Sequence, residues 1–221
     1  MRKAPACITR PGTAPKRAPT TLGTIAKVTE TLTTRDPNLT SRDGRALNHV
    51  ELVYRPGERD LAARVFALLG CRPHDTGRTY LTSFVEPAEG DFANNAVYAS
   101  EVTPEQWRLE CALADALADG GPVADAARGY LDRFHEEPQR STHFGIRVPD
   151  RERFDAVIAA LRDAAAHDPE LAGRVRVSAV FAPGDPGSLT DTMIQAFVHT
   201  DVVAAGLLVL GQHFELQYQF P

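Results

Sequence analysis

Two stretches of the chain, residues 47–69 and 141–162, open with the same pattern of apolar and polar positions. Each begins with residues that alternate in the manner of a strand, turns at a proline, and continues with apolar side chains at helical spacing. His49 and His143 occupy the same place in the two stretches. The pattern therefore predicts an internal repeat whose unit opens with a strand and a helix.

Shorter strand-like runs follow each opening. We expect these further strands over residues 79–85 and 96–102 in the first copy and over residues 174–181, 193–202 and 207–220 in the second. Between the copies we expect a helical insert, because Pro104 suits a first helical position and Gly120-Gly121-Pro122 interrupts the apolar stripe. The predicted fold class is α+β. Its parts are a tail over residues 1–44, a first βαβββ module over 45–103, the insert over 104–140 and a second βαβββ module over 141–221.

Alternation also sorts the side chains of each strand onto two faces. His49 and Glu51 share one face of the first strand, and His143 and Arg147 share the corresponding face of its counterpart. The later strands add two more such rows, which consist of Gln195, Phe197 and His199 and of His213, Glu215, Gln217 and Gln219. A sheet with one solvated face gives the same alternation, whereas two sheets curled around each other would enclose a polar cavity.

Charge and composition narrow the possible functions. The chain carries 24 basic and 29 acidic residues, and six of the basic residues fall within residues 1–29, which contain no acid. The acidic remainder argues against nucleic-acid binding, and the tail over residues 1–44 is expected to be disordered. No apolar run approaches the roughly 18 residues that span a bilayer, and no secretory signal is recognisable. Three scattered cysteines predict no disulfide framework, so we expect a cytoplasmic protein that does not enter a membrane.

The openings Leu47-Asn-His-Val-Glu-Leu52 and Thr142-His-Phe-Gly-Ile146, each leading into a helix and further strands, resemble those of the vicinal oxygen chelate superfamily. This superfamily includes glyoxalase I, bleomycin-resistance proteins and extradiol dioxygenases. The resemblance covers about residues 46–221 and implies two modules that pair into a cupped mixed sheet around a metal site. It places metal ligands on the first and last strands of the modules, which implies His49, His143 and Glu215 here.

Two histidines and one carboxylate form a facial triad, which suits Fe(II) and leaves positions for substrate and dioxygen. The resemblance therefore implies an Fe(II) dioxygenase that acts on a small aromatic or oxo-acid substrate, with Gln195 facing that substrate. A glyoxalase-type isomerase or lyase is the alternative, in which Glu101 is a fourth ligand and the ion is Zn, Ni or Mn. A metal-free protein that binds a small molecule, such as an antibiotic, is a third hypothesis from a different class.

Other members of the polar rows are candidates for substrate contacts. His199 is a candidate general acid or base, and Gln217 is a candidate hydrogen-bonding residue. Arg147 could hold a substrate carboxylate, although an ion pair with Glu51 is the simpler interpretation. His213 shares the face of Glu215 and is a competing ligand.

Three further histidines, His74, His135 and His167, are expected in solvent. Because two modules in one chain can complete a cup, the expected state is a monomer or a homodimer, with the small-molecule substrate and dioxygen as its partners.

Overall fold

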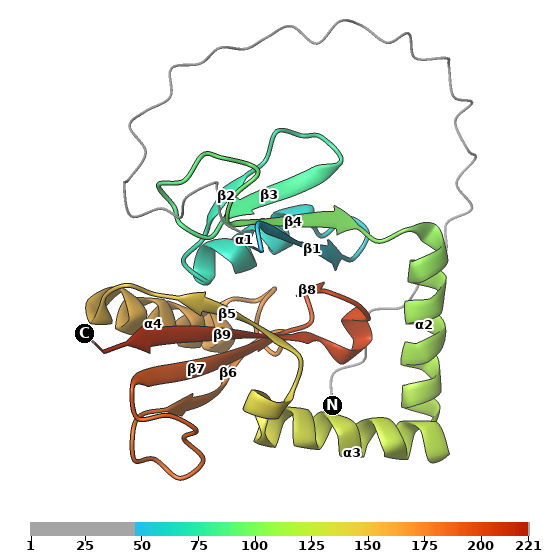
Figure 1. Cartoon of the computed structure of the whole chain (residues 1–221). Coiled ribbons are helices and arrows are strands. Elements are labelled where there is room, and N and C mark those ends of the chain that lie inside the picture. Colours follow the sequence, from blue (N-terminus) through green and yellow to red (C-terminus); the bar gives the residue numbers. More distant parts are fainter. Residues whose placement is uncertain (1–46, 221) are drawn as a thin grey trace, which may run out of the picture. The chain divides into compact units, whose positions relative to one another are not determined.

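The computed structural model describes residues 47–220 (Figure 1), so the predicted tail over residues 1–44 lies outside the described residues. The elements in chain order are β1 His49–Tyr54, α1 Arg59–Leu68, β2 Arg72–His74, β3 Tyr80–Phe84, β4 Ala96–Glu101, α2 Pro104–Asp119, α3 Pro122–Glu136, η1 Pro138–Arg140, β5 His143–Arg147, α4 Arg151–His167, β6 Val175–Phe181, β7 Met193–Thr200, β8 Val203–Ala204, η2 Leu208–Leu210 and β9 Gln212–Gln219. Helices and two mixed sheets confirm the predicted α+β class.

The first sheet has the strand order β2-β3-β4-β1-β8. β1 lies parallel to β4, whereas the β2–β3 and β3–β4 pairs are antiparallel. No pattern in the sequence predicts β2, which is three residues long and contains Pro73, a residue without a backbone donor. β8 comes from the second half of the chain and pairs antiparallel with β1, so the first sheet contains residues from both halves.

The second sheet has the order β5-β9-β7-β6, in which β5 lies parallel to β9 and the other pairs are antiparallel. In both sheets, then, the strand that precedes a helix lies parallel to the last strand of its half. The strand predicted over residues 207–220 is wrong at its start, because Leu208–Leu210 form a 3-10 helix and β9 begins at Gln212.

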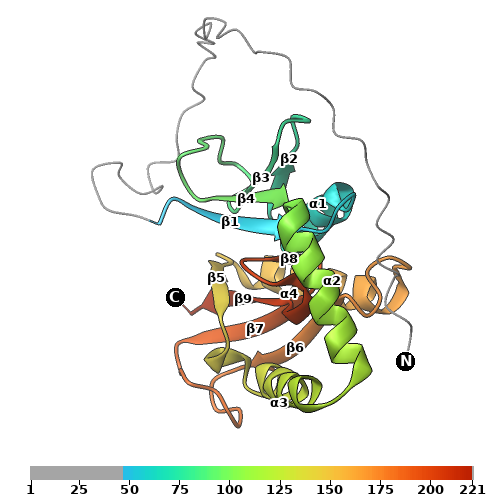
Figure 2. The same cartoon turned by 90° about the vertical axis from the view of Figure 1, so that its right-hand side faces the viewer.

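The insert forms the two predicted helices, and local signals explain their bounds. Thr103 caps α2, because its side chain accepts a hydrogen bond from the backbone N of Gln106 at 3.1 Å. Gly120 and Gly121 separate α2 from α3, and both adopt positive φ, which glycine tolerates. Figures 1 and 2 show α2 running past β8 and η2, with α3 lying below the sheet that contains β6 and β7.

The buried apolar side chains of both halves form one cluster. It contains Leu52 of β1, Phe66 of α1, Leu161 of α4 and Phe214 of β9, each at most 1% exposed. The helices α1 and α4 thus cover faces of the two sheets that meet the same core. The opposite faces of the sheets carry the polar rows.

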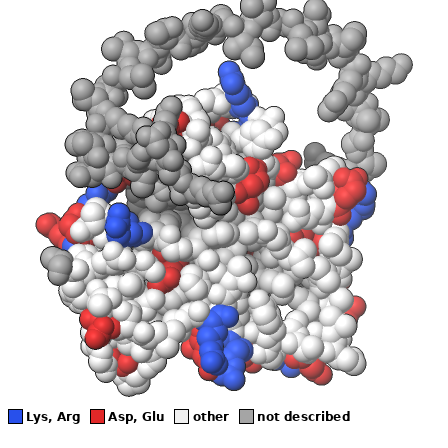
Figure 3. Space-filling view, viewed as in Figure 1, with Lys and Arg blue, Asp and Glu red and all other residues white. Residues whose placement is uncertain are grey.

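Charged side chains are mixed over the described surface. Residues 47–221 include 15 arginines, no lysine and 26 acids. On the face in Figure 3, blue and red side chains are scattered among white ones, and no broad blue area appears among the coloured residues. Within residues 47–220, no helix is both long enough and apolar enough to cross a membrane.

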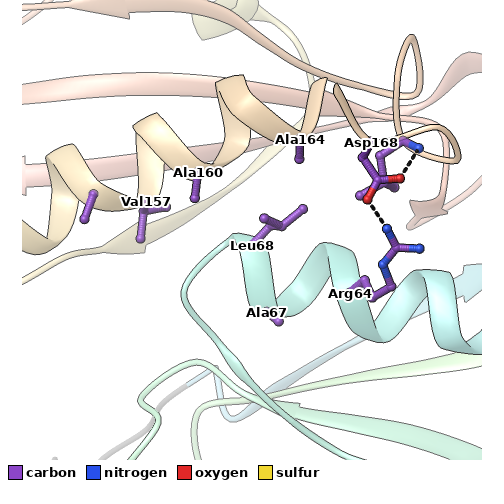
Figure 4. Close-up of a pocket in the computed structure, with 9 residues that line it drawn as sticks. Arg64, Ala67, Leu68, Val157, Ala160, Ala164 and Asp168 are labelled. Atoms are coloured by element: carbon purple, nitrogen blue, oxygen red, sulfur yellow. Dashed lines mark hydrogen bonds and ion pairs between the residues drawn. The ribbon is translucent and has the colours of Figure 1, made fainter. Parts of the chain in front are cut away.

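A cavity of about 490 Å³ lies between α1 and α4 (Figure 4). Small apolar side chains line it, among them Ala67 and Ala160, and Arg64 closes one end by pairing with Asp168. The cavity is on the helical side of the sheets and contains none of the predicted site residues.

Candidate functional site

The register of the second sheet brings the predicted polar rows onto one face. On β5 and β9, His143 lies opposite His213, Gly145 opposite Glu215 and Arg147 opposite Gln217. β7 continues this face with Gln195, Phe197 and His199, which lie opposite Gln217, Glu215 and His213. The sorting of these strands by alternation is therefore confirmed, and Phe214 and Leu216 face the core as expected.

His143 and Glu215 lie together near the middle of this face. The Nε2 atom of His143 is 3.2 Å from Oε2 of Glu215. The Glu215 side chain is 5% exposed and that of His143 is 24% exposed, so the carboxylate is buried and the imidazole is reachable from solvent. A carboxylate this deeply buried is stable only when it is paired or bound to a cation.

The second nitrogen of His143 fixes how its ring is protonated. Nδ1 lies 2.8 Å from the backbone carbonyl oxygen of Ser141, which can only accept, so Nδ1 carries a proton. In the neutral ring, Nε2 then presents its lone pair to the carboxylate oxygen of Glu215, which is also an acceptor. Two acceptors at 3.2 Å require a cation between them, either a second proton or a metal ion.

Gln195 holds the other oxygen of the carboxylate. Its Nε2 donates to Oε1 of Glu215, which fixes the orientation of the carboxyl group. The Oε1 atom of Gln195 is buried and has no hydrogen-bond partner among the described residues. A buried acceptor without a donor costs free energy, and a bound donor would remove that cost. The structure thus brings together three predicted residues, Gln195, His143 and Glu215.

Gly145 leaves the space beside this carboxylate open. A Cβ atom built on Gly145 would lie 3.6 Å from Nε2 of Gln217 and 3.7 Å from Oε2 of Glu215. Gly145 also lines a cavity of about 200 Å³, together with Phe144, Phe214 and residues of β1 that include His49. Residues of both halves line this cavity, and His143 and Glu215 are not among them.

His49 does not join His143 and Glu215. It is exposed on β1, its Nδ1 lies 2.7 Å from Oδ1 of Asn48, and its ring meets Tyr98 edge to face at 5.6 Å. Within residues 47–220, no group of three or more His, Cys, Asp or Glu side chains has an arrangement that could hold a metal ion. Two of the three predicted ligands are therefore adjacent, and the third lies on the other sheet.

Glu101, the alternative fourth ligand, faces away from His49. It lies opposite Tyr54 in the register of β1 and β4, whereas His49 lies opposite Ala96, five positions away and on the other face. Its Oε2 accepts a hydrogen bond from the backbone N of Gly57 at 2.9 Å. This placement argues against a four-ligand site of the glyoxalase type.

Arg147 is exposed at the end of the polar face, beside Gln217. The ion pair considered between Arg147 and Glu51 does not form, because Glu51 Oε1 instead accepts a hydrogen bond from Ser100 Oγ at 2.7 Å. Arg147 and Gln217 thus stay available for a ligand at this end of the sheet.

His199 belongs to a separate histidine cluster under α3. Its ring lies 4.5 Å from that of His135 and 5.3 Å from that of His213, and Phe134 covers all three. Its Nε2 points toward the backbone at Gly211, where an added Cβ would approach to 2.2 Å. These contacts favour a packing role for His199 over the predicted role in catalysis.

The cluster also shows that the prediction of a solvated His135 is wrong. Burial, followed by the charges of His199 and Arg176, lowers the pKa of His135 to about 4. Burial and the neighbouring histidines likewise lower the pKa of His213 to about 3. The i, i+4 spacing of Tyr130 and Phe134 is the sequence signal that could have predicted an apolar face on α3, and hence the packing of this end of the insert against the sheet.

The chain matches no model of a protein family and no curated protein. Among solved structures, it is similar to a hypothetical protein from S. aureus, with a TM-score of 0.36 and 11% sequence identity over 80% of this chain and 96% of that one.

Proposed function

We propose that the chain is a metal-dependent enzyme of the vicinal oxygen chelate type, with its site on the polar face of β5, β7 and β9. The observation that carries this proposal is the pair of facing acceptors, His143 Nε2 and Glu215 Oε2, at 3.2 Å. Two atoms bound at about 2.1 Å to one ion, at angles of about 90–110°, are about 3.0–3.4 Å apart. The separation of these two atoms fits that range.

The groups around the pair also suit a metal site. Histidine ligands usually donate their other ring nitrogen to a carbonyl or carboxylate, as His143 does to Ser141. Ligating carboxylates are usually held by a further hydrogen bond, as Glu215 is by Gln195. Such partners fix the orientation of ligands before an ion binds.

The strand order gives independent support for the family. Apart from β8, which pairs with β1, each half places a strand, a helix and three further strands in one order, with the first strand parallel to the last. This is the βαβββ pattern that the sequence resemblance implies for both modules. The cupped pairing of the modules remains part of the proposal.

His143 and Glu215 would hold a divalent ion, and Gln195 and Gln217 would bind the substrate beside it. A bound ion would supply a Lewis acid that polarises a substrate oxygen. The unpaired Oε1 of Gln195 accepts a hydrogen bond from a substrate hydroxyl or N–H group. Arg147, exposed at the same face, attracts a substrate carboxylate, which agrees with an oxo-acid substrate.

The proposed reaction is Fe(II)-dependent dioxygenation of a small aromatic or oxo-acid substrate. It needs His49 as the third ligand, and His49 reaches the cavity of about 200 Å³ that Gly145 also lines. The alternative, a glyoxalase-type isomerase or lyase with Zn, Ni or Mn, needs Glu101 as a fourth ligand, and Glu101 lies on the other face of β4.

Metal analysis of protein purified without added metal tests this function. We expect about one equivalent of a transition metal per chain, and its loss in His143→Ala. His167→Ala is the matched control, because His167 is exposed and pairs with the exposed Asp163 on its own helix. Retention of the metal in His143→Ala would contradict the proposed site.

A metal-free binding protein is the second candidate, and the position of His49 on the other sheet favours it. In that case a proton lies between His143 and Glu215. Absence of bound metal, also after anaerobic Fe(II) loading, would support this candidate and reject the enzyme.

A further inference from the structure

The polar face of the first sheet carries a second group of side chains that the His143 and Glu215 pair does not use. The register places His49 and Glu51 of β1 on the same face as Tyr98 and Ser100 of β4. β3 adds Tyr80, which lies opposite Ser100. These residues come from three neighbouring strands and form one surface on the side of the sheet away from the core.

Three aromatic rings lie next to one another on this surface. The ring centroids of His49 and Tyr98 are 5.6 Å apart, and those of Tyr80 and Tyr98 are 6.3 Å apart, both in edge-to-face geometry. Tyr80 is 51% exposed, and Glu51 is also exposed. The negative faces of such rings attract cations.

The carboxylate of Glu51 has no cationic partner among the described residues. Its Oε1 accepts a hydrogen bond from Ser100 Oγ at 2.7 Å, which holds it beside the rings. The charges of Glu51 and Asp91 reach Tyr98, since burial, then Glu51, then Asp91 raise the pKa of the phenol. The local potential is therefore negative, within a chain whose residues 47–221 carry 26 acids and 15 arginines.

The loop between β3 and β4 keeps the far side of this surface in place. Tyr98 donates through its hydroxyl to the backbone carbonyl of Phe92. Glu89, which is 7% exposed, accepts hydrogen bonds from the backbone N atoms of Gly90 and Asp91 at 2.9 Å each, and so closes the loop on itself. The aromatic surface is thus built by ordered contacts and does not depend on a bound ligand to form.

We propose that the surface formed by His49, Glu51, Tyr80 and Tyr98 binds an organic ammonium cation. The carboxylate supplies the opposite charge, and the exposed tyrosine and histidine rings supply the faces over which an alkylated nitrogen lies. An anion is disfavoured by Glu51. A neutral aromatic molecule leaves the carboxylate without a partner.

Choline is a suitable probe, and its neutral isostere 3,3-dimethyl-1-butanol is the matched ligand. Titration of the full chain at low ionic strength, followed by the tyrosine ring signals in NMR, gives the Kd for each. We expect saturable binding of choline and at least tenfold weaker binding of the alcohol. Equal binding of the two would overturn the proposal, as would no binding of choline.

Two substitutions locate the site. Glu51→Gln keeps the acceptor for Ser100 and removes the charge, so we expect choline to bind about tenfold more weakly. Tyr80→Leu removes one exposed ring and is expected to weaken binding about threefold. Glu105→Gln is the control, because Glu105 is an exposed acid on α2 that pairs with Arg108. Binding that is unchanged in Glu51→Gln, or equally weakened in the control, would contradict the site.

Neither Glu51 nor Tyr80 belongs to the proposed metal site. His49 is shared with that site as its proposed third ligand, so choline is titrated into metal-stripped protein, where its binding does not depend on whether His143 and Glu215 can bind a metal.

Discussion

Arg174 donates two parallel hydrogen bonds to Glu58, each with an N–O distance of 2.8 Å. Its Nε atom also donates to Asp201 at 2.8 Å, and Asp201 accepts from Arg55 at 2.7 Å. Arg55 and Glu58 follow β1, whereas Arg174 and Asp201 belong to the second half. This network joins the two halves beside their shared core.

Replacing Arg174 by Met should lower the free energy of unfolding by about 3 kcal/mol, because it leaves the partly buried Glu58 without its cationic partner and Asp201 paired with Arg55 alone. Urea unfolding followed by circular dichroism measures this change. Arg151→Met is the control, because the Arg151–Asp155 pair is more than half exposed on both sides, and it should cost less than about 0.5 kcal/mol. Equal effects of the two substitutions would show that the network does not stabilise the fold.

Two glycines of the second half should differ in their sensitivity to alanine substitution. Gly211 has φ of 71°, and a Cβ there would lie 2.8 Å from the Thr200 carbonyl oxygen, so Gly211→Ala should destabilise the protein by about 2–4 kcal/mol. Gly145→Ala meets only ordinary contacts at 3.6 Å and should change stability by less than about 1 kcal/mol. Thermal unfolding compares the two, and a similar loss in both would contradict the described packing.

Stability should fall in mild acid because α3 docks through a histidine that stays neutral. The pKa of His135 is lowered from 6.5 to about 4, so between these values the unfolded chain binds a proton that the folded chain does not. The free energy of unfolding therefore decreases as the pH falls from about 6.5 to about 4. His199, His213, Arg176 and Asp132 face His135, and burial outweighs the attraction of Asp132.

Urea unfolding at pH 7 and pH 5 measures this effect. Because His135 is partly exposed, we expect it to account for a loss of about 1 kcal/mol in the free energy of unfolding between pH 7 and pH 5. This part of the loss should be absent in His135→Gln. His167→Gln, on exposed surface, should keep the full pH dependence. The idea is wrong if His135→Gln and the parent chain lose the same free energy between the two pH values.

Local pattern predicts much of this fold. Alternation assigns the correct faces to His143, Gln195 and Glu215, because side chains on a strand alternate whatever the sheet packs against. The glycine and proline signals at 120–122 likewise separate α2 from α3, because backbone conformation is a local property.

Features that depend on packing between distant segments cannot be predicted from the local sequence pattern. His49 has the expected face, but its distance from Glu215 depends on how two sheets meet, and no spacing in the chain encodes that. His135 is half-buried because the insert docks on β7 and β9, and the sequence of its own helix does not indicate this contact. β8 joins the first sheet through only two residue pairs, too few to leave a pattern.

Mn(II) binding followed by electron paramagnetic resonance tests the central claim most directly, because free Mn(II) gives a sharp signal that is lost on binding. Titration of metal-stripped protein should show one bound ion per chain, and Glu215→Gln, which keeps the shape of the side chain, should weaken binding at least tenfold. His49→Ala then reports whether the third predicted ligand takes part. If Mn(II) does not bind, or binds Glu215→Gln as tightly as the parent chain, then His143 and Glu215 share only a proton and the metal site does not exist.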